Sequence, residues 1–97
     1  MRVKVRGRYW NLEFVSRLPR GGGHQDDYGR CDSPTTEKKS ILVLSKLRGR
    51  ERLEILIHEL FHAGCWDLDE EAVEEIAGDI ARVLDNLGYR CDEEDKD

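Results

Sequence analysis

The residues with the clearest chemical meaning are His58-Glu59-Leu60-Phe61-His62, which form an HExxH sequence. Histidines at positions i and i+4 of a helix project from the same side, so both imidazoles can reach one zinc ion. Glu59 lies beside them, where its carboxylate can accept a proton from a water molecule that the metal activates. The spacing therefore predicts Zn²⁺ as the cofactor, with His58 and His62 as ligands and Glu59 as the catalytic base.

A catalytic zinc ion usually has three protein ligands and one water, so a third ligand has to come from elsewhere in the chain. No histidine follows His62, and His24 lies in a glycine-rich segment that would need an unusual excursion to reach the helix. The acidic C-terminal half offers carboxylates instead. Helix geometry places some of these carboxylates on the solvent-facing side of the helix, which excludes them as ligands. The remaining candidates are Asp67, Asp69, Glu70 and Glu74.

The HExxH sequence, followed by Glu70-Glu-Ala-Val-Glu74-Glu-Ile-Ala77, resembles the gluzincin arrangement, in which a glutamate from a following helix completes the zinc site. In several such families this helix reads Glu-x-x-Ala-(Asp/Asn)-x-x-Ala. The resemblance implies Glu70 as the third zinc ligand and Glu74 as a carboxylate that orients a histidine ligand. Asp67 or Asp69 is the second choice for the third ligand, because Glu70 comes early after His62.

The chain as a whole resembles very small zincin-like proteins of phage and bacterial origin, and it is similar to the metallopeptidase core of the ImmA/IrrE type. The specific part of the match covers residues 53–84. It implies a zinc metallopeptidase acting on a peptide or protein substrate, whose extended backbone would pair with residues 41–45. The alternatives are a non-catalytic zincin-like regulator, with Trp10 and Trp66 as contact residues, and a DNA-associated protease.

Two helices are expected to carry these residues. The first is predicted from about residue 50 to residue 63, where apolar residues recur with helical spacing. Its apolar stripe centres about 170° from the midpoint of His58 and His62, so the histidines are not expected in the apolar core. The second helix is predicted to begin at Asp67 or Asp69, which precede a glutamate in a pattern typical of helix capping.

The N-terminal half predicts strands. Residues 3–5 and 9–15 alternate apolar with polar side chains and predict a β-hairpin. Residues 16–30 are rich in glycine and polar residues, so a mobile loop is expected. Residues 39–45 predict a short third strand at a sheet edge. The expected fold is α+β, with a small antiparallel or mixed sheet of about three strands packed against the HExxH helix and a C-terminal helix.

With 97 residues and a mass of 11.3 kDa, the chain has room for one domain, which we assign to residues 1–90. Residues 91–97 form an acidic run that we expect to be disordered. The net charge of −5 is divided unevenly, since residues 1–52 carry 13 basic and 6 acidic residues and residues 53–97 carry 3 and 15. Nucleic acid is a possible but less favoured partner of the basic half.

The three cysteines, Cys31, Cys65 and Cys91, fit neither a disulfide framework nor a zinc knuckle, which indicates reduced thiols in the cytoplasm. The basic N-terminus is not followed by the apolar stretch of a signal peptide, and no apolar run is long enough for a transmembrane helix. The expected location is therefore cytoplasmic, with no membrane partner. The sequence does not indicate an oligomeric state.

Overall fold

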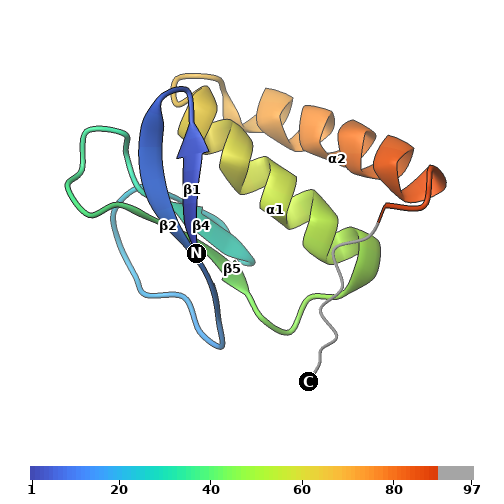
Figure 1. Cartoon of the computed structure of the whole chain (residues 1–97), viewed down its shortest axis with the longest axis horizontal. Helices are drawn as coiled ribbons and strands as arrows, with labels where there is room; N and C mark the ends of the chain where they lie inside the picture. Colours follow the sequence, from blue (N-terminus) through green and yellow to red (C-terminus); the bar gives the residue numbers. More distant parts are fainter. Residues whose placement is uncertain (90–97) are drawn as a thin grey trace.

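A computed structural model of the chain describes residues 1–89, in which a five-stranded sheet and two helices form the fold (Figure 1). The strands are β1 (Arg2–Val5), β2 (Arg8–Val15), β3 (His24–Gln25), β4 (Gly29–Cys31) and β5 (Ser40–Leu44). The helices are α1 (Gly49–Gly64) and α2 (Glu70–Asn86). The α+β class is confirmed, but the prediction of about three strands is wrong. The predicted disordered run 91–97 lies outside the described residues.

The sheet has the order β1-β2-β5-β4-β3, and β2 and β5 form its one parallel pair within residues 1–89. The predicted hairpin is confirmed, since β1 and β2 are antiparallel neighbours. The edge position expected for residues 39–45 is wrong, because β5 is bonded to β2 on one side and to β4 on the other. Because both sides of β5 are already paired, a substrate strand cannot pair with it. The expectation that extended substrate backbone pairs with residues 41–45 is therefore also wrong.

The mobile loop expected at residues 16–30 is wrong for its second half, which forms β3 and β4. Three consecutive glycines, Gly21, Gly22 and Gly23, take positive φ angles of 84°, 73° and 63°, which glycine adopts without steric cost. At Gly23 a Cβ would lie 2.4 Å from the carbonyl oxygen of Cys31, so the two chain segments approach too closely for a side chain. Arg30 donates hydrogen bonds to the Gly21 carbonyl and fixes the segment.

The apolar core lies between the sheet and α1. Alternate residues of β2, Trp10 and Leu12, are buried beside Ile41 and Val43 of β5, and Ala63 of α1 belongs to the same cluster. Helix α2 packs on α1, which lies between α2 and the sheet (Figure 1). This arrangement leaves one side of α1 facing β4 and another facing α2.

Both predicted helices are confirmed. Helix α1 spans nearly the expected residues, and α2 begins after Asp69, whose Oδ1 accepts a hydrogen bond of 2.7 Å from the backbone N–H of Ala72. Such an N-cap satisfies one of the free amides of the first turn. Neither α1 nor α2 has the length and apolar composition that spanning a membrane requires.

Candidate metal centre

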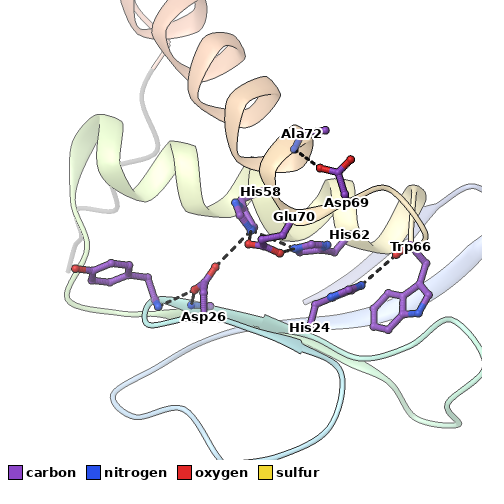
Figure 2. Close-up of polar contacts among 10 residues, drawn as sticks. His24, Asp26, His58, His62, Trp66, Asp69, Glu70 and Ala72 are labelled. Atoms are coloured by element: carbon purple, nitrogen blue, oxygen red, sulfur yellow. Dashed lines mark hydrogen bonds and ion pairs between the residues drawn. The ribbon is translucent and has the colours of Figure 1, made fainter.

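His58 and His62 lie one turn apart on α1 and point into the space between α1, the first turn of α2 and the β3–β4 hairpin (Figure 2). Both side chains lie off the apolar stripe, as expected, but both residues are buried, with exposed fractions of 3% and 1%. A solvent-exposed histidine pair is therefore excluded. Buried imidazoles need polar partners, and the partners come from α2 and from the hairpin.

Three side chains meet at this point. The Nε2 atoms of His58 and His62 are 3.1 Å apart. His58 Nε2 lies 3.0 Å from Oε2 of Glu70, and His62 Nε2 lies 3.0 Å from Oε1 of the same carboxylate. A tetrahedral zinc ion with bonds of about 2.0–2.2 Å separates its ligand atoms by roughly 3.3 Å. The triangle of His58, His62 and Glu70 therefore has nearly the size that such an ion requires.

The facing imidazoles also fit a cation chemically. Burial, and then the neighbouring His24, lower the pKa of His62 to about 4, so its ring is neutral at pH 7. Two facing Nε2 atoms can satisfy each other only if one carries a proton and the other does not. A bound cation would accept both lone pairs at once.

The four carboxylates considered as the third ligand have different surroundings in the structure. Glu70 contacts both histidines, whereas the Asp69 side chain is used as the N-cap of α2. Asp67 is exposed and lines a different hollow, next to Gly64 and Trp66. Glu74 is exposed at the cleft beside His58, and within residues 1–89 no hydrogen bond or ion pair joins it to a histidine. Its orienting role stays a prediction.

Glu59 is as deeply buried as His62, at 1% exposure, and within residues 1–89 neither of its carboxylate oxygens has a hydrogen-bond partner. Burial, reinforced by the negative charges of Asp26 and Glu70, raises its pKa to about 9. Gly29 of β4 makes room for it, because a Cβ at this glycine would lie 2.6 Å from Glu59 Oε2. An unsatisfied buried carboxyl group next to two imidazoles is consistent with a place for a metal ion and its water.

Two further residues of the site lie in the hairpin, His24, which the sequence prediction set aside, and Asp26, which it missed (Figure 2). The His24 ring stacks on His62, with centroids 4.2 Å apart, so setting it aside as too far from the helix was wrong. Asp26 Oδ2 lies 3.4 Å from His58 Nε2, while Asp26 Oδ1 accepts hydrogen bonds from the amides of Tyr28 and Gly29. The Asp-x-x-Gly turn was the available signal.

The site thus consists of two adjoining groups of potential ligands, His24 with His62 and Glu70, and Asp26 with His58 and Glu59; within each group the ligand atoms lie within 4.8 Å of one another. A cleft of about 300 Å³ opens beside His58. Acidic side chains dominate its lining, namely Asp26, Asp27, Glu51, Glu54, Glu70 and Glu74. These residues could hold a metal ion.

No protein-family model matches the chain, and no curated protein or solved structure is significantly similar to it.

Proposed function

We propose that the protein is a zinc-dependent metallopeptidase. The observation that carries the proposal is the meeting of His58 Nε2, His62 Nε2 and the Glu70 carboxylate at separations of 3.0–3.1 Å, beside the buried carboxyl group of Glu59. Two imidazoles and one carboxylate form a ligand set used by catalytic zinc in peptidases. A purely structural site has no need of Glu59, which is not a member of the triangle.

When bound, zinc would polarise the substrate carbonyl and lower the pKa of a water molecule towards neutrality. Glu59 takes the proton of this water while the water oxygen bonds to the carbonyl carbon. It then gives the proton to the amide nitrogen as the C–N bond breaks. For this role Glu59 must be ionised, and a divalent cation would favour ionisation by offsetting the charges of Asp26 and Glu70.

Strand β3 is the edge of the sheet that lies next to the site, and it is the place where we expect extended substrate backbone to pair. Edge strands offer unpaired N–H and C=O groups to another chain. Because β3 comprises only His24 and Gln25, this pairing would add few hydrogen bonds. Side chains of the substrate would then provide much of the binding energy in the acidic cleft.

The test is the Glu59→Gln variant, which keeps the size of the side chain but cannot accept the proton. We expect zinc content equal to that of the wild type and cleavage of a peptide library reduced by about 10²–10⁴-fold or more. Glu75→Gln is a matched control, because Glu75 is an exposed carboxylate on α2 outside the site. Cleavage by Glu59→Gln at the wild-type rate would refute the mechanism.

A non-catalytic zinc-binding regulator is the second candidate. It is favoured by the deep burial of Glu59, whose exposed fraction of 1% leaves little room for a substrate beside it. This candidate predicts that the wild type holds zinc tightly and cleaves nothing in the library. It also predicts that Glu59→Gln changes no property of the zinc-loaded protein except its stability.

A further inference from the structure

We propose that His24 is a further ligand of this metal, so that the resting site has three imidazoles and one carboxylate. The inference rests on the metal site of the proposed function, but it does not require peptidase activity. It assigns a binding role to a residue of the β3–β4 hairpin, whereas the HExxH pattern places every ligand on helices.

The position of His24 is the first step. Its ring lies nearly parallel to that of His62, at an interplanar angle of 17° and a centroid distance of 4.2 Å. A ring nitrogen of His24 lies within 4.8 Å of the ligand atoms of both His62 and Glu70. Because the two rings are nearly parallel, their in-plane lone pairs do not meet at one point. Binding the same ion therefore requires the His24 ring to turn as well as to approach, until its nitrogen reaches the separation of roughly 3.3 Å found around tetrahedral zinc.

The second step is the tautomer of His24. Its Nε2 lies 3.1 Å from the carbonyl oxygen of Trp66, and because a carbonyl can only accept, Nε2–H is the donor. In the neutral ring the lone pair is then left on Nδ1. Metal-bound histidines characteristically donate their other N–H to a carbonyl or carboxylate. His24 has this support, whereas among residues 1–89 His62 Nδ1 has no hydrogen-bond partner.

The third step is how the chain holds His24 in place. The three glycines before it take positive φ angles, and Arg30 anchors the first of them through its carbonyl. His24 is paired in register with the fully buried Cys31, and its ring also contacts the Trp66 ring at a centroid distance of 4.1 Å. These contacts hold the imidazole beside the metal site.

A fourth protein ligand has a consequence for access. Three imidazoles and Glu70 fill a tetrahedral zinc site, so catalysis would require five-coordination or the departure of His24. Since His24 is on an edge strand two residues long, it is the ligand whose departure disturbs the fold least. We therefore expect His24 to be the weakest-held ligand of the four.

The experiment measures zinc affinity by competition with a chelator. We expect His24→Ala to bind zinc about 10- to 100-fold more weakly than the wild type, and free imidazole to restore part of the loss. Gln25→Ala is the matched control, because Gln25 is the exposed neighbour on the same strand; its affinity should stay within about twofold. Equal affinities of His24→Ala and Gln25→Ala would overturn the inference.

A second measurement avoids any effect of substitution on folding. X-ray absorption at the zinc edge of the loaded wild-type protein should indicate three imidazole ligands, and two would overturn the inference while leaving the peptidase proposal intact. Cleavage that persists in Glu59→Gln would overturn the peptidase mechanism and leave His24 as a ligand. A wild type that binds no zinc would overturn both.

Discussion

The metal centre has two walls of different construction. The helical wall consists of His58, Glu59, His62 and Glu70, and the hairpin wall consists of His24, Asp26 and Gly29. Hydrogen bonds within each helix and the cap at the start of α2 position the helical wall. The hairpin wall instead depends on pairing with the distant strand β5 and on glycine conformations. Local helix geometry thus sets the two histidines, the packing of α2 on α1 completes the tightest triangle of ligands with Glu70, and strand pairing closes the site around it.

The largest expected effect is the loss of a ligand from the helical wall. Apparent binding free energies of roughly 10–16 kcal/mol for zinc are shared among about four ligands, so His62→Ala should weaken zinc binding by at least about 100-fold. The loss should exceed that of His24→Ala, measured by the same chelator competition. If His24→Ala weakened zinc binding more than His62→Ala, the hairpin wall would contribute more to zinc affinity than the helical wall.

The next effect is the pH dependence of stability in the metal-free protein. Glu59 has a pKa of about 9 when folded and an ordinary value of 4.5, so between these values the folded state holds a proton that the unfolded state releases. The free energy of unfolding should therefore fall as pH rises, by at most about 1.4 kcal/mol per unit.

His62 acts in the opposite direction, because its lowered pKa of about 4 makes stability rise with pH up to 6.5. The effect of Glu59 should thus be clearest from pH 6.5 to 9. Urea unfolding across this range is the measurement, with Glu59→Gln as the control that removes the titrating group. Equal slopes for the wild type and Glu59→Gln would show that Glu59 is not held protonated.

A pair of glycine substitutions compares the hairpin wall with the interior of helix α2. Gly29→Ala would place a Cβ 2.6 Å from Glu59 Oε2 and 2.9 Å from its Cγ, so we expect a loss of about 1–3 kcal/mol in the free energy of unfolding. Gly78→Ala meets only the tip of Glu54, at 3.4 Å, inside α2. There we expect a gain of about 0.5–1 kcal/mol from helix propensity. Thermal unfolding of both variants tests this, and a neutral Gly29→Ala would mean that the walls are not in close contact.

The smallest effect concerns the charge of Asp26. Asp26→Asn keeps the Oδ1 that accepts from the amides of Tyr28 and Gly29, but it removes a charge that raises the pKa of Glu59. The midpoint of the Glu59 titration should move to lower pH, by less than about one unit. Asp27→Asn, an exposed neighbour, should leave it unchanged. Equal midpoints of the Glu59 titration in Asp26→Asn and Asp27→Asn would show that the charge of Asp26 does not raise the pKa of Glu59.

The helical wall could be predicted from the sequence because its geometry is local. The i, i+4 spacing of His58 and His62 needs only a helix, and the cap at Asp69 fixes where the next helix begins. The choice of Glu70 needed more, since it depends on how α2 packs on α1. Spacing alone left Asp67, Asp69 and Glu74 open, and the resemblance to gluzincins favoured the carboxylate that does contact both histidines.

The hairpin wall could not be predicted in this way. Strands β3 and β4 have two and three residues, which is too short for an alternation of apolar and polar side chains to be recognised. Their pairing depends on β5, and the parallel partnership of β2 with β5 moves β5 to the middle of the sheet. In a sequence, consecutive glycines indicate a mobile loop. Here Gly23 instead lies where two chain segments approach too closely for a side chain.

The burial of Cys31 in β4 has a practical consequence. This residue pairs with His24 on one side and Ile41 on the other, and it is fully shielded from solvent. Burial also raises the pKa of its thiol, so in the folded protein Cys31 is neither accessible nor ionised. Because Cys31 belongs to the apolar core, an alkylating reagent can reach it only when β4 leaves that core, by local opening or by global unfolding. The labelling rate of Cys31, followed on its own peptide by mass spectrometry, therefore sets an upper limit on how often the hairpin wall leaves the site.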